Sequence, residues 1–214
     1  MKYKTIIFDL DGTLLNTLSD LHTSVNYALC LHEMKKRSKE EVRHFLGNGV
    51  RRLIELSVPN GTSSKDVEDT LNDFRRHYLK HSLDFTAPYD GIEELLKQLH
   101  DKGIEIAIVS NKLDSAVKEL HRKFFSKYIK LAIGETDTIR RKPAPDMVEE
   151  CIRQLGCEKT SCIYVGDSEV DLQTAKNAGI PCCSVCWGFR DKQQLIDVGA
   201  RLIIDHPNEL LNHL

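Results

Sequence analysis

Short apolar runs alternate with amphipathic helical patterns along most of the chain, and this alternation restricts the possible folds more than any other feature of the sequence. Residues 5–8 form the first run, which is β-branched and apolar and ends at polar residues, as a buried strand does. Similar runs predict strands at 104–109, 131–133, 162–165, 182–186 and 202–204. Between them, apolar residues recur at helical spacing, for example at Ile92, Leu95, Leu96 and Leu99. The pattern predicts an α/β fold, a Rossmann-like parallel sheet with helices on both faces.

The segment 16–86 breaks this alternation, because it contains helical patterns and no convincing strand. Two apolar stripes with helical spacing occur in it, one at Leu18, Leu21, Val25 and Ala28 and the other at Val67, Leu71, Phe74 and Tyr78. The segment leaves after the first strand and returns before Pro88. We therefore expect an all-helical insert of residues 16–86 on an α/β core of residues 1–15 and 87–214.

Composition limits the partners of the protein. The 214 residues carry 30 Lys and Arg against 32 Asp and Glu, so charge gives no reason to expect nucleic acid or an anionic membrane. No apolar run approaches the roughly 20 residues that span a bilayer, and a signal peptide is not expected at the start. The seven Cys are scattered, which favours free thiols in a reducing cytoplasm. We expect a cytoplasmic protein, monomeric or homodimeric.

Polar side chains follow several of the predicted strands. In open parallel sheets, ligands bind outside the carboxyl ends of the strands, so residues there are candidates for a site. The candidates from separate strand ends are Asp9, Asp11, Ser110, Asn111, Lys142, Asp167, Ser168 and Asp171. The sequence thus predicts four carboxylates, a serine hydroxyl and one ammonium along a common edge of the sheet.

Four carboxylates in one cleft repel one another. Two unit charges 4 Å apart repel by about 4 kcal/mol at an effective dielectric constant near 20, and one lysine cannot offset several such pairs. An all-oxygen site favours a hard cation such as Mg²⁺, which commonly keeps a substrate phosphate among its ligands. These residues therefore predict metal-assisted phosphoryl transfer from a small phosphorylated substrate.

The residues after the first strand suit the chemical step. Asp9 is the candidate nucleophile, which would form an aspartyl-phosphate. Asp11 is the candidate general acid, protonating the leaving group and later accepting a proton from the attacking water. Gly12 allows close approach of the backbone, and Thr13 offers its hydroxyl and amide groups to phosphate oxygens.

The remaining candidates come from the other strand ends. Ser110 and Lys142 would hold the equatorial oxygens of the phosphoryl group. Asp167 is the candidate metal ligand, with Ser168 beside it and Asp171 placed to orient Lys142 or a metal-bound water. Asn111 is either a substrate contact or a turn residue.

Four short motifs of this chain resemble those of the haloacid dehalogenase-like hydrolase superfamily, in the same order and at similar spacing. They are Asp9-Leu10-Asp11-Gly12-Thr13-Leu14, Ser110-Asn111, Lys142-Pro143 and Gly166-Asp167-Ser168-x-x-Asp171. The resemblance implies Mg²⁺-dependent hydrolysis through a phosphoaspartate. It also implies that Asp9, Asp167 and the backbone carbonyl of Asp11 are the metal ligands.

The helical insert resembles the cap of the phosphoglycolate phosphatase and β-phosphoglucomutase branch of that superfamily. Gly47-Asn48-Gly49 is similar to a cap segment of phosphoglycolate phosphatases, and Pro88-Tyr89-Asp90-Gly91 is similar to their P-Y-P-G, with Asp90 in place of a proline. Asn48 and Arg51 are candidate substrate contacts in this cap, although they are also compatible with a solvated helix start. The resemblance makes 2-phosphoglycolate the best single substrate hypothesis.

Other functions are compatible with the same core. A pyrophosphatase, a sugar-phosphate phosphatase and a phosphomutase would all use these motifs. A phosphoacceptor regulator is an alternative outside the enzymes, since it would hold Mg²⁺ and an aspartyl-phosphate without turnover. Asp11 and the helical insert argue against it, because a switch needs neither a leaving-group acid nor a lid.

Overall fold

The computed structural model describes residues 2–214, which divide into two compact units. The first unit comprises the chain up to Leu15 together with Pro88–Leu214, and the second comprises Asn16–Ala87. The short strands β2 (Leu15–Asn16) and β3 (Ala87–Pro88), which pair with each other, lie where the chain passes from one unit to the other.

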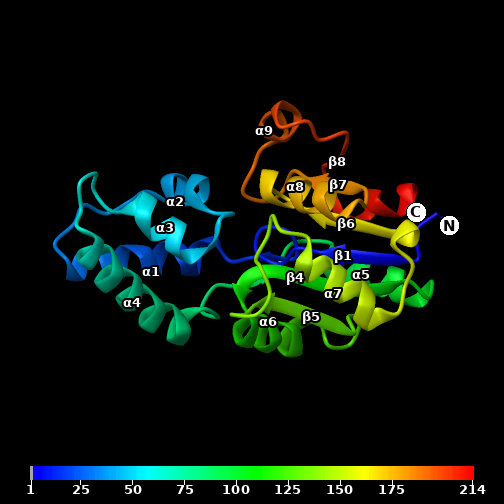
Figure 1. Ribbon diagram of the computed structural model, residues 1–214, viewed down its shortest axis with the longest axis horizontal. Coiled ribbons are helices and arrows are strands. Elements are labelled where there is room, and N and C mark those ends of the chain that lie inside the picture. Colours follow the sequence, from blue (N-terminus) through cyan, green and yellow to red (C-terminus); the bar gives the residue numbers. More distant parts are fainter. Residues whose placement is uncertain (1) are drawn as a thin grey trace. The chain divides into compact units, whose positions relative to one another are not determined.

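The first unit is built on a six-stranded sheet with the strand order β5-β4-β1-β6-β7-β8 (Figure 1). The pairs between neighbouring strands are parallel. The strands are β1 Thr5–Phe8, β4 Glu105–Leu113, β5 Leu131–Glu135, β6 Cys162–Gly166, β7 Cys182–Val185 and β8 Leu202–Ile204. The chain moves outward from β1 through β4 to β5 and then returns to β6 on the other side of β1. A switch point therefore lies between β1 and β6, where sheets of this kind bind ligands.

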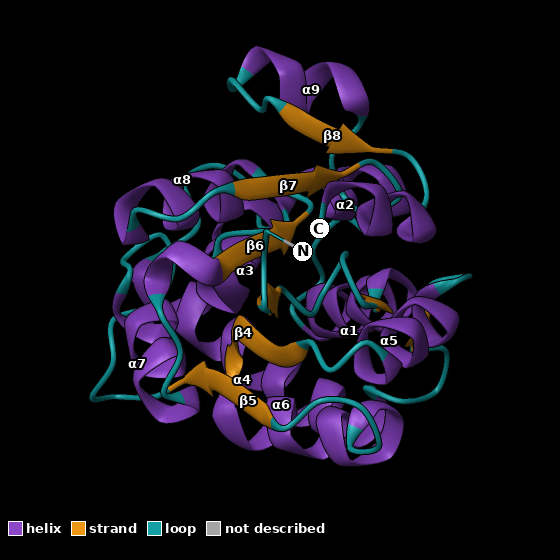
Figure 2. Ribbon diagram, turned by 90° about the vertical axis from the view of Figure 1, so that its right-hand side faces the viewer, coloured by secondary structure: helices purple, strands orange, loops and turns teal. Residues whose placement is uncertain are grey.

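Helices cover both faces of this sheet, which confirms the predicted α/β fold. Figure 2 shows α7 and α8 on one side of the strands and α5 on the other. Strand residues such as Ile7, Val109 and Tyr164 pack against Val148 of α7 and Ala175 of α8 in a buried apolar cluster. The helical elements are α5 Ile92–Asp101, α6 Asp114–Leu120, a π-helical turn His121–Phe125, α7 Asp146–Leu155, α8 Glu169–Ala178, α9 Lys192–Asp197 and the 3₁₀ turns Lys159–Ser161 and Pro207–His213.

Strand β4 is longer than its apolar run predicts. The predicted strand ends at residue 109, whereas β4 continues to Leu113, which pairs with Glu135 of β5 after a shift in register. The prediction that Ser110 and Asn111 follow the strand is therefore wrong. The strand extends beyond its apolar run because Leu113 pairs with Glu135 of β5 after a register shift between Val109 and Leu113.

The second unit contains the helices α1 Leu18–Leu31, α2 Lys39–Phe45, α3 Gly49–Ser57 and α4 Ser64–His81. Helices α1 and α4 pack together and bury Leu21, Val25 and Phe74. The buried carboxylate of Asp20 accepts hydrogen bonds from the backbone and hydroxyl of Thr86 and so ties the end of the unit to its beginning. Among residues 2–214, no helix is long and apolar enough to cross a membrane.

Candidate active site

Three buried carboxylates meet at the carboxyl ends of β1 and β6. Asp9 follows β1, Asp167 follows β6, and Asp171 lies in the first turn of α8. Their residues are 7%, 1% and 1% exposed, and each offers an oxygen atom within 4.8 Å of the others. Asp9 was predicted from one motif, and Asp167 and Asp171 from another. The fold brings the two motifs together because β1 and β6 are neighbouring parallel strands.

Lys142 carries the positive charge inside this cluster. Its Nζ atom lies 2.7 Å from Asp9 Oδ1, 2.7 Å from Asp171 Oδ1 and 3.2 Å from the hydroxyl of Tyr164. Burial alone would lower the pKa of this lysine, but Asp171 and Asp9 raise the pKa well above its usual value. Asp9 and Asp171 thus favour the charged ammonium form of Lys142, which can bind a phosphoryl oxygen.

Lys142 alone does not neutralise the three carboxylates. Burial first, and then the negative charge of Asp171, raise the pKa of Asp9 well above its usual value and raise the pKa of Asp167 to about 7. With the three carboxylates ionised, the single ammonium leaves two negative charges in a buried space. A divalent cation would balance that charge, so this buried acidic triad can hold a metal ion.

The lysine and its partners are held by neighbouring polar groups. The side-chain amide of Asn111 donates to the backbone carbonyl of Lys142 and accepts from its backbone N–H. The hydroxyl and backbone N–H of Ser168 both donate to Asp171 Oδ2, which leaves Asp171 Oδ1 for Lys142. Asn111 thus fixes the position of Lys142. The sequence analysis had considered Asn111 only as a substrate contact or a turn residue.

Asp167 is packed so tightly that two of its neighbours must be glycine. A Cβ atom at Gly12, which has a φ of +91°, would lie 2.4 Å from Asp167 Oδ2, and one at Gly188 would lie 2.4 Å from Asp167 Cβ. The backbone N–H of Phe189 donates to Asp167 at 2.6 Å, and the Thr13 hydroxyl lies 3.4 Å from its other oxygen. Gly12 and Thr13 therefore contact the acidic cluster itself.

Asp11 has a cationic partner that the sequence analysis missed. The Lys112 Nζ atom lies 3.0 Å and 3.2 Å from the two carboxylate oxygens of Asp11. The backbone N–H of Lys112 donates to the hydroxyl of Ser110, which is buried. Lys112 directly follows the Ser110-Asn111 motif, and this position could have marked it as a residue of the site. It was overlooked because an isolated lysine in a polar stretch is typical of the protein surface.

The predicted contacts of the helical insert belong to the second unit. Asn48 is the residue that precedes α3, and the Arg51 guanidinium forms an ion pair with Glu68 of α4. Hydrogen bonding to Glu68 raises the pKa of this arginine. The role of both residues in substrate binding stays a prediction.

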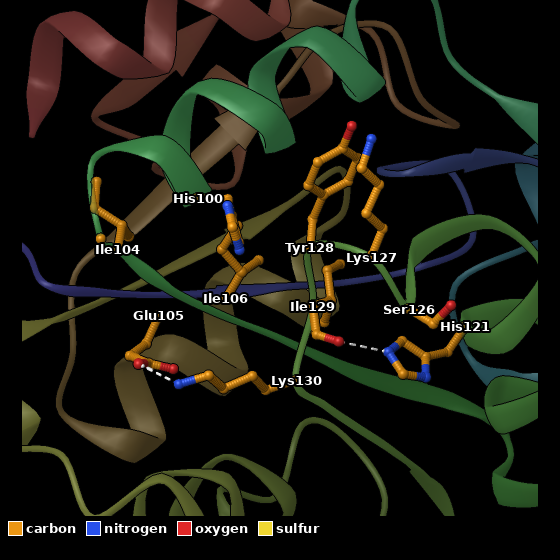
Figure 3. Close-up of a pocket in the computed structure, with 11 residues that line it drawn as sticks. His100, Ile104, Glu105, Ile106, His121, Ser126, Lys127, Tyr128, Ile129 and Lys130 are labelled. Atoms are coloured by element: carbon orange, nitrogen blue, oxygen red, sulfur yellow. Dashed lines mark hydrogen bonds and ion pairs between the residues drawn. The ribbon is translucent and has the colours of Figure 1, made fainter.

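A cavity of about 340 Å³ lies at the amino-terminal ends of β4 and β5, whereas the acidic cluster lies at carboxyl ends of strands (Figure 3 shows the cavity). It is lined by Ile104–Ile106 at the start of β4 and by Tyr128, Ile129 and Lys130 just before β5. Figure 3 shows Lys130 paired with Glu105, and the His121 ring hydrogen-bonded to the Ile129 carbonyl. This cavity is therefore separate from the residues to which the sequence motifs point.

The fold and this acidic site define a class of protein. A profile of the haloacid dehalogenase-like hydrolase family matches residues 6–185. The chain belongs to this family.

Similar proteins narrow the class further. Phosphoglycolate phosphatase of Pseudomonas syringae is 30% identical over 97% of this chain and 78% of its own length, and that of Aquifex aeolicus is 32% identical over 87% and 86%. A crystal structure from Lactobacillus delbrueckii subsp. bulgaricus, provisionally named as a phosphoglycolate phosphatase, has a TM-score of 0.95 at 36% identity and covers 100% of this chain and 98% of its own. The protein is an enzyme of the phosphatase type, in the phosphoglycolate phosphatase-like branch, which confirms the predicted resemblance and disfavours the phosphoacceptor regulator.

The raised pKa of Asp167 predicts how stability depends on pH in metal-free protein. The carboxyl keeps its proton to about pH 7 in the fold, whereas its ordinary pKa is 3.8. The folded state therefore binds more protons between these values, so stability falls as pH rises from about 4 through 7, by on the order of 4 kcal/mol from this group. Thermal melts of the wild type and Asp167→Asn at pH 5 and pH 8 measure this.

The Asp167→Asn variant serves as the internal control, because a neutral amide has no proton to lose. We expect the difference in melting temperature, variant minus wild type, to be larger at pH 8 than at pH 5. An equal difference at both pH values would show that Asp167 is not destabilised by its charge in the folded protein.

Proposed function

We propose that this protein is a Mg²⁺-dependent phosphatase that hydrolyses a small phosphorylated metabolite, with 2-phosphoglycolate as the best candidate, through an aspartyl-phosphate on Asp9. The observation that carries the proposal is the buried cluster of Asp9, Asp167, Asp171 and Lys142 at the switch point of the sheet. The similarity to phosphatases named for phosphoglycolate supports the substrate.

The donor set fits a hard divalent cation. Asp9 and Asp167 would ligate it through carboxylate oxygens and Asp11 through its backbone carbonyl, while Asp171 is already engaged by Lys142 and Ser168. The bound Mg²⁺ would supply positive charge to the phosphoryl oxygens. The two negative charges that Lys142 leaves uncompensated match this cation.

In the first chemical step, Asp9 attacks the phosphorus atom and the bond to the leaving oxygen breaks. Asp11 delivers a proton to that oxygen, so the leaving group departs as a neutral alcohol. Lys142 and the Ser110 hydroxyl bind the phosphoryl oxygens as charge spreads over them. The contacts of Lys142 to Asp9 and Asp171 hold its ammonium beside the nucleophile before the substrate arrives.

In the second step, water attacks the phosphorus of the aspartyl-phosphate, and the carboxylate of Asp11 accepts a proton from that water. The acyl-phosphate bond breaks, and Asp9 is regenerated as a carboxylate with release of inorganic phosphate. We assign residues 16–86 the role of a cap that excludes bulk water and reads the leaving group, with Asn48 and Arg51 as candidate contacts.

A second candidate substrate class is favoured by one relative. N-acetylmuramic acid 6-phosphate phosphatase of Pseudomonas aeruginosa is 27% identical over 100% of this chain and 96% of its own length. A sugar phosphate is therefore the alternative to 2-phosphoglycolate. Pyrophosphate hydrolysis and phosphomutase activity are compatible with the same core and stay predictions. A monomeric or homodimeric state also stays a prediction.

We also propose a cytoplasmic location. All seven cysteines are free thiols. One of them is exposed and three more are half-buried. Free thiols of this kind persist in reducing compartments.

A panel of phosphorylated metabolites, assayed for phosphate release with Mg²⁺, tests the proposal. It should include 2-phosphoglycolate, hexose 6-phosphates, an amino-sugar 6-phosphate, pyrophosphate and an aryl phosphate. We expect the highest kcat/KM for 2-phosphoglycolate. A higher value for an amino-sugar phosphate would replace the substrate assignment, and the absence of turnover on every compound would refute the phosphatase.

A further inference from the structure

We propose that Lys112 is a specificity-determining residue that binds a carboxylate on the leaving group of the substrate. The inference rests on the proposed function, because it assumes that Asp11 protonates the leaving oxygen of a phosphate ester. It deepens that function, because a residue of the core strand β4 would then select substrates whose leaving group is acidic. The sequence analysis assigned Lys112 no role.

The position of Lys112 beside Asp11 defines what its ammonium can reach. Its Nζ atom contacts both carboxylate oxygens of Asp11, at 3.0 Å and 3.2 Å. A general acid must come within about 3 Å of the atom that it protonates, which places Nζ within roughly 6 Å of the leaving oxygen. In 2-phosphoglycolate a single methylene separates that oxygen from the carboxylate, so the carboxylate can reach Lys112.

The two lysines of the site pair with different carboxylates. Lys142 is held by Asp9 and Asp171, on the side of the nucleophile. Lys112 is held by Asp11, on the side of the proton donor and therefore of the leaving group. Transfer of the phosphoryl group does not require a second cation beside the acid, and such a cation suits a leaving group that is itself anionic.

The exposure of the pair makes this contact accessible. The Lys112 side chain is 8% exposed and the Asp11 side chain is 21% exposed, so Asp11 is the more accessible member of the pair. An ammonium has three N–H donors, so Lys112 can bind a second carboxylate while it keeps its contact with Asp11. The backbone N–H of Lys112 donates to Ser110, which ties this residue to the phosphate-binding part of the same strand.

The test compares 2-phosphoglycolate with its neutral amide, 2-phosphoglycolamide, which has nearly the same size and the same ester bond. A hydrogen bond to a charged group predicts that the wild type prefers the acid by about 10- to 100-fold in kcat/KM. In Lys112→Met this preference should fall to near one, mainly through a higher KM for the acid. Lys112→Arg should keep most of it, because the charge remains.

Ratios of the two substrates separate recognition from general damage to the site. Equal losses of Lys112→Met on the acid and the amide would overturn the inference, because they would mean that Lys112 only orients Asp11. Lys130→Met, which removes an exposed lysine at the amino-terminal end of β5, should change neither rate. If Lys112→Met does not fold, Lys112→Gln takes its place. Its ratio of kcat/KM for 2-phosphoglycolate over the amide is then compared with that of the wild type.

Failure of the inference and failure of the proposed function give different results. A wild type that hydrolyses both esters without preference overturns the role of Lys112 and leaves the phosphatase standing. A wild type that hydrolyses no phosphate ester overturns both.

Discussion

Replacing Asp9 by asparagine is expected to reduce phosphate release by at least about 10⁴-fold, because the amide oxygen cannot serve as the nucleophile. The change is nearly isosteric and removes only the charge. The assay uses an aryl phosphate and 2-phosphoglycolate, so that the loss is shown to be independent of the leaving group. Brief incubation with substrate labelled in the phosphoryl group should give acid-stable labelling of the wild type and none of Asp9→Asn.

The fold of Asp9→Asn should survive, which separates a catalytic loss from unfolding. Burial and the neighbouring charge of Asp171 raise the pKa of Asp9 well above its usual value, so its ionised form destabilises the folded protein above that pKa. A neutral amide removes this cost, and Lys142 keeps Asp171 as a partner. We expect a melting temperature at neutral pH equal to or above that of the wild type.

Glu105→Gln is a matched control for the Asp9 variant. It also replaces one carboxylate with an amide, but Glu105 pairs with Lys130 at the start of β4, away from the acidic cluster. Its activity should equal that of the wild type. Turnover by Asp9→Asn at the wild-type rate would remove Asp9 from the mechanism.

The fold was predictable because its strands and helices carry strong, regular patterns. β1 begins and ends where its apolar run does, because it is buried on both faces. β8 also matches its apolar run, although it is an edge strand and only partly buried. β4 was predicted too short, because the pairing of Leu113 with Glu135 depends on a register that no local pattern encodes. The π-helical turn His121–Phe125 has no comparable sequence signal.

The candidate site was predictable where a residue occurs in a motif and unpredictable where it acts through spatial contacts. Asp9 and Asp167 come from motifs that follow neighbouring strands, and the parallel topology alone brings such ends together. Lys142 lies on the loop between β5 and α7, and hydrogen bonds to Asn111 hold that loop in place. Tyr164 gave no sign of its hydrogen bond to Lys142, because a tyrosine within an apolar strand is compatible with simple core packing. Lys112 was overlooked because its partner Asp11 lies 101 residues earlier in the chain.

Removal of divalent metal should abolish turnover, and this is the second large effect that we expect. EDTA should lower phosphate release by more than about 10³-fold, and excess Mg²⁺ should restore it. Ca²⁺ is a useful comparison, because it also prefers oxygen ligands but is larger and takes more of them. It should bind and fail to restore turnover, because its flexible coordination does not hold the phosphoryl group in one geometry beside Asp9.

Metal binding can also be measured without turnover, by the effect of Mg²⁺ on thermal unfolding. Below about pH 5 the carboxyl of Asp167 holds its proton, because burial raises its pKa to about 7, and Mg²⁺ must displace that proton to bind. At pH 8 no such competition remains, so Mg²⁺ should raise the melting temperature more at pH 8 than at pH 5. The same addition should have little effect on Asp167→Asn, which lacks one ligand and one negative charge. Undiminished turnover in EDTA, together with melting temperatures that ignore Mg²⁺ at both pH values, would mean that the buried negative charge is balanced by protons and not by a cation.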